Sequence, residues 1–121
     1  MLQEIKKLLP DTYPVFIGDL PAEPDNVCVL YLTGGFDPLR EIGFQPAYAT
    51  LPTFQVRVRN KTYEAAFAYL ALVRQRLDGY TGNMGGPTIW GIFSQGDVLP
   101  LGKDDRGRSE FTLNFRVIRE A

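Results

Sequence analysis

The sequence predicts one domain of the α+β class. The chain has 121 residues, which is enough for one hydrophobic core, and its 45% hydrophobic and 22% charged content is ordinary for a globular protein. Segments with strand character cluster along the chain instead of alternating with helices. In chain order we expect a helix, three strands, a second helix and two further strands. This order favours a sheet with helices gathered on one side over a doubly wound α/β fold.

The first third of the chain shows one short helix and two strands. Apolar residues recur at helical spacing over residues 2–9, and Pro10 ends this segment because proline disfavours the helical region for the residue before it. Residues 15–17 form a short apolar run that indicates a buried strand. Residues 27–32 indicate a second strand, which we expect to stop at Gly34-Gly35.

Residues 35–52 form the segment that is hardest to assign. It is long for a connection in a compact domain, and such loops are usually functional or mobile. Its prolines and aromatic residues are Phe36, Pro38, Phe44, Pro46, Tyr48 and Pro52. We therefore expect an extended arm or loop at 35–52 within a single domain of residues 1–121. It either packs on a neighbouring subunit or folds back on its own core.

The remaining elements follow from hydrophobic periodicity. Residues 54–59 alternate apolar and polar side chains, which predicts a strand, and apolar residues at spacings of three and four predict a helix over 62–78. We expect the helix to bury one stripe of side chains, namely Tyr63, Ala66, Phe67, Leu70, Val73 and Leu77. A strand at 89–93, a short edge piece at 97–101 and a strand at 109–119 flank a charged turn, which predicts an antiparallel hairpin.

Composition argues against enzymatic chemistry. The chain has no histidine, which excludes Ser-His-Asp and Cys-His catalytic pairs and nearly all zinc sites. The single cysteine, Cys28, lies in an apolar run and is expected to be a buried, inert thiol. The glycine-rich loop at 80–87 leads into a strand instead of a helix, so it does not match a phosphate-binding loop. We expect no catalytic residue, no cofactor and no metal.

Charge and hydropathy narrow the location and the partners. The net charge of -1 gives no basic excess for general binding to a phosphate backbone. The N-terminus lacks the apolar core of a signal peptide, and no apolar run approaches the roughly 20 residues that span a bilayer. We expect a soluble chain made in a cytoplasm, with no membrane partner.

Polar residues alternate along two predicted strands on the face opposite the helix. They are Gln55, Arg57, Arg59, Thr112, Asn114 and Arg116. Two interpretations remain open for this face: an exposed polar surface, or an interface with ion pairs between subunits, for which arginine is well suited. Trp90 likewise is either a core residue or an interface anchor.

Two segments then resemble a known family. The first comprises residues 51–60, Leu-Pro-Thr-Phe-Gln-Val-Arg-Val-Arg-Asn, with Tyr-Glu-Ala-Ala at 63–66, and the second is residues 99–117. In the second segment a Gly-Lys-Asp-Asp-Arg-Gly-Arg turn at 102–108 leads into the alternating strand Phe-Thr-Leu-Asn-Phe-Arg-Val at 111–117. Over residues 50–119 the chain resembles the small minor capsid or tail-terminator (tail-completion) proteins of long-tailed bacteriophages.

The resemblance implies a single mixed, mostly antiparallel sheet with two helices packed on one face. It also implies a homo-hexameric ring at the head-proximal end of the phage tail, which stops tail-tube polymerisation and joins the tail to the head. The implied partners are further copies of the chain, the tail-tube protein and the head connector or completion protein. The genome would pass through the ring without sequence-specific binding. The implied location is the tail or neck of the virion, assembled in the bacterial host cytoplasm.

The candidate contact residues for such a ring come from the arm, the charged turn and the polar sheet face. They are Phe36, Phe44, Tyr48, Gln55, Arg57, Arg59, Arg106, Arg108, Thr112, Asn114 and Arg116. Two alternatives remain. The first is a head-completion or connector ring of the same virion. The second is a small ligand-binding domain that uses the 80–87 loop beside Trp90.

Overall fold

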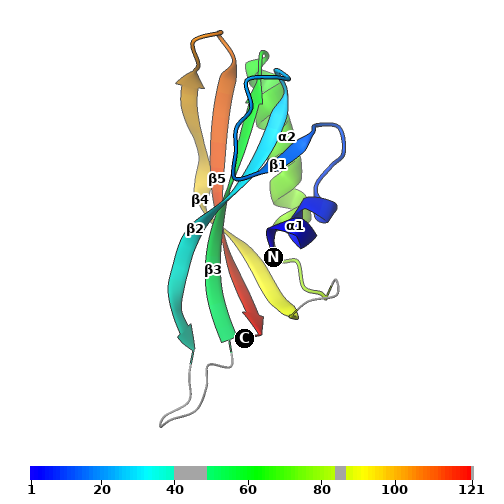
Figure 1. Ribbon diagram of the computed structural model, residues 1–121, viewed down its shortest axis with the longest axis vertical. Helices are drawn as coiled ribbons and strands as arrows, with labels where there is room; N and C mark the ends of the chain where they lie inside the picture. Colours follow the sequence, from blue (N-terminus) through cyan, green and yellow to red (C-terminus); the bar gives the residue numbers. More distant parts are fainter. Residues whose placement is uncertain (40–48, 84–86, 121) are drawn as a thin grey trace.

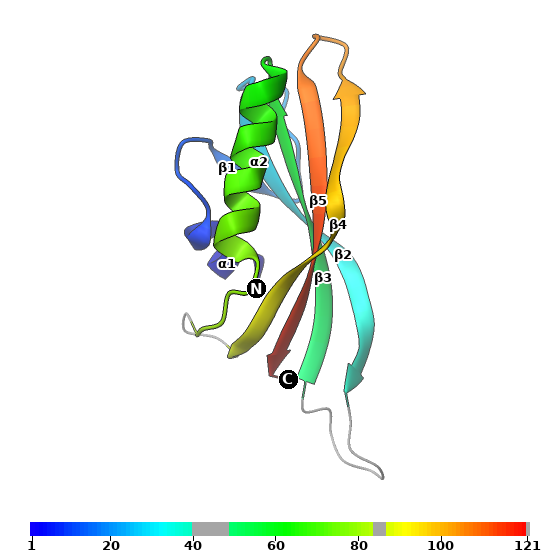
Figure 2. The same ribbon diagram turned by 180° about the vertical axis from the view of Figure 1, so that it is seen from behind.

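The computed structural model describes residues 1–39, 49–83 and 87–120. Within these residues the strands form a five-stranded sheet in the order β1-β2-β3-β5-β4. The elements are α1 (Leu2–Leu8), β1 (Val15–Ile17), β2 (Val27–Leu39), β3 (Ala49–Asn60), α2 (Tyr63–Leu77), β4 (Ile89–Lys103) and β5 (Ser109–Glu120). β1 pairs with β2 in parallel and the other neighbours pair antiparallel. Both helices lie on one side of the sheet (Figures 1 and 2). This confirms the predicted α+β class.

The core lies between the helices and one face of the sheet. Leu70, Val73 and Leu77 of α2 are fully buried against apolar side chains of β3 and β5. Across those strands Phe54 and Phe115 stack with ring centroids 5.1 Å apart. Each such side chain contributes about 1.5–3 kcal/mol when it leaves water, so this face holds the domain together.

The predicted end of β2 at Gly34-Gly35 is wrong. The strand passes through both glycines and continues to Leu39, with φ of +95° at Gly34 and +158° at Gly35. A Cβ atom on Gly35 would lie 2.6 Å from the carbonyl oxygen of Leu51, so β2 can approach β3 here only without a side chain. The glycines therefore permit a bulge within the strand, where we had expected them to end it.

Strand pairing also extends into the segment at 35–52. Phe36 pairs with Leu51 and Leu39 pairs with Ala49, so both ends of this segment belong to the β2–β3 hairpin. Residues 40–48, which include the candidates Phe44 and Tyr48, lie outside the described residues.

β4 is a single strand where we predicted a strand and a separate edge piece. It runs from Ile89 to Lys103 and pairs with β5 along its length, which confirms the predicted hairpin. Register shifts between Gln95 and Leu99 and between Pro100 and Gly102 interrupt the ladder without ending it. Such β-bulges accommodate extra residues within one strand. The sequence pattern at these residues had indicated a break between two strands.

Candidate subunit interface

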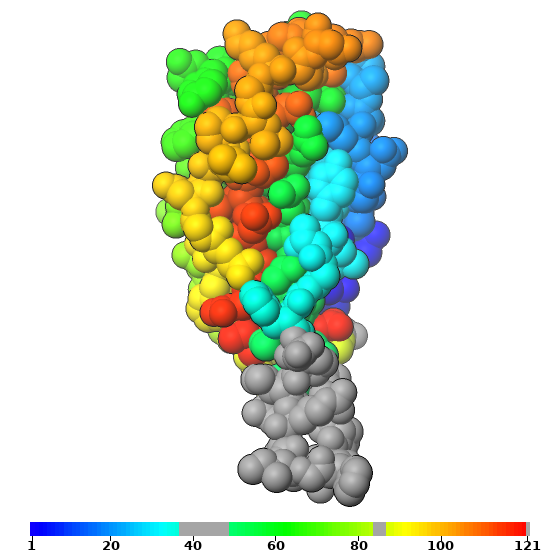
Figure 3. Space-filling view, turned by 90° about the vertical axis from the view of Figure 1, so that its left-hand side faces the viewer, coloured from blue at the N-terminus to red at the C-terminus, as the bar shows by residue number. Residues whose placement is uncertain are grey.

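The face of the sheet opposite the helices carries the predicted polar residues. The register pairs Gln55 with Asn114, Arg57 with Thr112 and Thr53 with Arg116 on this face. Figure 3 shows that neither helix covers it. We call it the open face. Its two ends differ in chemistry.

At one end of the open face, two arginines are buried under a turn. Arg59 and Arg108 are only 2% and 4% exposed. Arg59 donates from Nη2 to the carbonyl oxygen of Pro24 at 2.7 Å and from Nε to that of Asp25 at 3.2 Å, and Arg108 donates from Nη1 to that of Ala22 at 2.6 Å. Arg59 is therefore not part of an exposed polar surface, and Arg108 of the charged turn is covered in the same way. They hold the chain segment 22–25 onto their own sheet.

Asp104 completes this buried cluster within the charged turn. Its carboxylate accepts the Nε of Arg108 at 2.8 Å and the backbone N–H groups of Arg106 and Arg108 at 3.0 and 2.9 Å. Burial alone would raise the pKa of Asp104, but the hydrogen bonds from Arg108 and Arg106 prevail and lower it. The pKa of Arg59 is lowered, chiefly by burial and then by the charge of Arg108. The charged turn on which the family resemblance rests therefore stabilises the fold of the subunit itself.

The other candidates are distributed between covered and open positions. Thr112 is buried, and Arg57 forms a part-buried ion pair with Glu110 at 2.9 Å. Arg106 forms an exposed ion pair with Glu23 at 2.6 Å. Gln55 is half-buried and donates to Asn114 at 3.2 Å. The exposed candidates on the described part of the chain are Phe36, Arg106, Asn114 and Arg116.

At the opposite end, apolar side chains cross the open face. Phe36 of β2 pairs with Leu51 of β3, and Ile118 of β5 pairs with Gly91 of β4. The register between β3 and β5 places Leu51 opposite Ile118, so these residues form one row across four strands. Phe36 is 54% exposed, while Leu51 and Ile118 are half-buried.

Phe93 extends this row along β4, and Trp90 lies nearby on the same strand. The ring of Phe93 lies over Gly91, where an added Cβ atom would meet a ring carbon at 2.5 Å. Trp90 occupies the register shift between Ile89 and Gly91 and is 46% exposed, so the interpretation of Trp90 as a core residue is wrong. We call Phe36, Leu51, Phe93 and Ile118 the apolar row.

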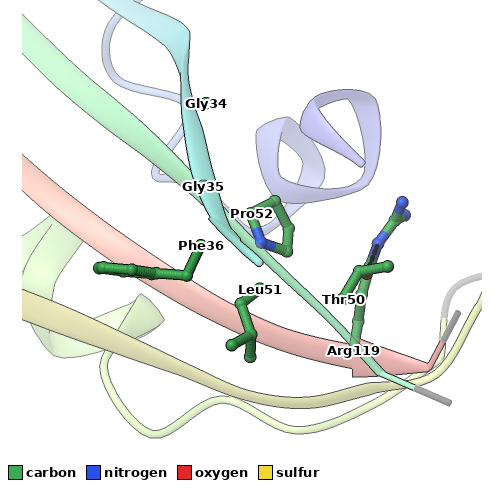
Figure 4. Close-up of a pocket in the computed structure, with 7 residues that line it drawn as sticks. All are labelled: Gly34, Gly35, Phe36, Thr50, Leu51, Pro52 and Arg119. Carbon is green, nitrogen blue, oxygen red and sulfur yellow. Dashed lines mark hydrogen bonds between the residues drawn. The ribbon is translucent and has the colours of Figure 1, made fainter. Parts of the chain in front are cut away.

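A groove of about 260 Å³ lies beside the apolar row (Figure 4). Its lining residues are Gly34, Gly35, Phe36, Thr50, Leu51, Pro52 and Arg119. Figure 4 shows Phe36 and Leu51 pointing away from Thr50 and Arg119, and Arg119 donates from Nε to Thr50 Oγ1 at 3.2 Å. Arg119 is the one charged side chain in this lining, so the groove offers no acid–base pair.

A second apolar surface lies on the outer side of α2. The helix segment 65–73 contains no charged residue, and Phe67 and Leu72 are 47% and 38% exposed. Tyr63 and Phe67, which we expected in the buried stripe, are half-exposed and contact the ring edge of Phe111 at centroid distances of 4.9 and 5.9 Å. The periodicity predicted one apolar face, but exposed apolar side chains also lie on the flanks of α2, while Glu64 and residues 74–76 make its ends polar.

The described residues contain no group of three or more His, Cys, Asp or Glu side chains placed to hold a metal ion. The Cys28 thiol is fully buried, and burial raises its pKa to about 12. Over residues 1–39, 49–83 and 87–120, no helix is long and apolar enough to cross a membrane.

Comparison with known proteins gives the family. Residues 2–121 match the family described as bacteriophage tail terminator protein. No curated protein matches the sequence. Among solved structures, a chain from the "Virion of native gene transfer agent (GTA) particle" has a TM-score of 0.70 at 15% identity, over 97% of this chain and 92% of that one, which shows a shared fold. The resemblance noted in the sequence is confirmed: the chain belongs to the bacteriophage tail terminator protein family and is a structural component of a phage tail.

Proposed function

We propose that six copies of this chain form a closed ring at the head-proximal end of a phage tail. The ring ends polymerisation of the tail tube and joins the tail to the head, and it acts without catalysis. The family match over residues 2–121 carries this proposal. Assembly takes place in the cytoplasm of the bacterial host, and the genome passes through the ring without sequence-specific contacts.

The distribution of apolar surface supports a ring. A cyclic assembly needs head-to-tail contacts between two different surfaces of the same chain, whereas a twofold dimer uses one surface twice. The register places the apolar row on the open face, and α2 lies on the other side of the sheet (Figure 2). A contiguous patch of exposed apolar side chains on a folded protein usually marks an interaction site.

Termination then follows from geometry. One face of the ring matches the last ring of the tube, and the other face offers no site to a further tube subunit. Two partners are therefore required: the tail-tube protein on one side and the head connector or completion protein on the other.

Deletion of the gene and complementation by the intact chain test this proposal. Without the protein, electron micrographs are expected to show tubes of uncontrolled length that lack heads, and the intact chain restores uniform tails joined to heads. Tails of normal length in the deletion strain would refute it. Co-purification with the portal or adaptor protein, and not with tail-tube protein, would assign the ring to head completion instead.

A further inference from the structure

We infer that the outer side of α2 in one copy packs on the open face of the next copy, and that Glu64 of the helix pairs with Arg116 of the neighbouring sheet. This inference rests on the proposed ring and specifies the surfaces that close it. The occupant of the open face is thus a second copy of this chain.

The sequence of α2 calls for a second apolar partner. Its inner side, which includes Leu70 and Val73, is fully buried in the core of its own subunit. Its exposed half presents Ala68 to solvent, with Phe67 and Leu72 on the two flanks. The helix is polar only toward its two ends, at Glu64 and at residues 74–76, so its exposed apolar middle is a surface that a partner outside the subunit can cover.

The open face offers the matching layer. A sheet with helices on one side only leaves its other face without a packing partner, and a helix on that face completes a layered core. The apolar row supplies Phe36 and Phe93, which are 54% and 39% exposed. A contact of α2 with α2 would leave this row uncovered.

Charge complementarity selects the orientation. Glu64 is exposed in the first turn of α2, and it shares the outer side with Phe67, three residues further on. Arg116 is exposed on the open face directly across from its strand partner Phe93. Neither Glu64 nor Arg116 has an ion-pair partner among the described residues. Each surface therefore carries an unpaired charge beside an exposed phenylalanine, and these two charges are opposite.

A charge exchange tests the pair. Glu64→Arg and Arg116→Glu should each raise the dissociation constant of the ring about tenfold or more, because each places like charges together. The double variant should return it to within about threefold of the parent value, measured by mass photometry and sedimentation velocity. Asp105→Arg is the matched control, since it makes the same charge change on the exposed turn and should not alter assembly. Unchanged assembly in either single variant, or no recovery in the double variant, overturns the inference.

Cross-linking in assembled tails gives an independent measurement, and it applies even where the free chain is monomeric. The native thiol Cys28 is fully buried, so only the introduced cysteines should form disulfides between subunits. Oxidation of the Glu64→Cys, Arg116→Cys double variant should give a ladder of covalent multimers that ends at the ring size, and neither single variant should cross-link. A dimer from Glu64→Cys alone indicates a twofold contact of α2 with α2 and overturns the inference, as does the absence of a ladder.

The two proposals fail in different ways. If the double cysteine variant restores uniform tails but gives no ladder, the interface is wrong and the terminator function stands. If the deletion strain itself makes normal tails, the function is wrong, whatever the cross-links show.

Discussion

Replacement of Arg59 by methionine should destabilise the subunit without breaking the ring. The Arg59 side chain is 2% exposed, and its guanidinium donates to the carbonyl oxygens of Pro24, Asp25 and Ala22 at 2.7, 3.2 and 3.4 Å. Methionine keeps much of the aliphatic stem but removes every donor. The turn at 22–25 then depends on the contacts that Arg108, Arg106 and Lys61 make with it.

The magnitude follows from these contacts. A hydrogen bond to a charged group contributes about 1.5–3 kcal/mol, so three would give about 4.5–9 kcal/mol as an upper limit. The contact at 3.4 Å is weak, and the carbonyl groups regain water when the turn lifts. We therefore expect Arg59→Met to lower the free energy of unfolding by about 3 kcal/mol, which is the value of one to two hydrogen bonds to a charged group.

Urea denaturation followed by Trp90 fluorescence measures this loss. With an m value of about 1.5 kcal/mol/M, the midpoint should fall by about 2 M. The protein concentration must stay below that of ring formation, because assembly raises apparent stability. Arg106→Met is the control: its ion pair with Glu23 ties down the same turn but is exposed, so it should change stability by less than about 1 kcal/mol.

Two results would refute this reasoning. One is an Arg59→Met variant within about 1 kcal/mol of the parent, which would mean that the buried hydrogen bonds contribute little. The other is a variant of parental stability that fails to assemble, which would restore Arg59 as a contact between subunits.

Three further predictions concern single residues. Gly35→Ala should lower stability by about 2 kcal/mol in thermal unfolding, because the new Cβ atom would meet the Leu51 carbonyl at 2.6 Å at a φ of +158°; an unchanged midpoint contradicts this. The folded pKa of Asp104 is lowered, so its stabilising effect is complete above the unfolded value of 3.8 and is lost as the pH falls through the folded pKa. The parent and Asp104→Asn should therefore converge in stability toward low pH, and a constant difference would show that Asp104 contributes no charge-dependent stability. Since burial raises the pKa of Cys28 to about 12, the native thiol should react with iodoacetamide at least about 100-fold more slowly than in urea, and equal rates would contradict its burial.

The family could be predicted from the sequence because the motifs that indicate it lie within short segments of the chain. The alternation along residues 111–117 and the charged turn before it specify a hairpin whatever the rest of the chain does. The same holds for the helix over 62–78, whose inner stripe follows from a period of 3.6 residues. Local periodicity predicts which residues share a face, and the register confirms that Gln55, Asn114 and Arg116 do so.

The sequence by itself thus determined the elements, their class and the family, together with the absence of histidine chemistry. Only the tertiary structure decided what covers each face. Arg59 and Arg116 lie on the same face in equally polar patterns, yet the turn at 22–25 buries the first and leaves the second exposed. Phe67 has the spacing of a core residue but lies at the edge of the helix contact. The physical reason is that the burial of a side chain depends on which distant segment of the chain packs over it. The periodicity within one helix or strand does not specify that segment.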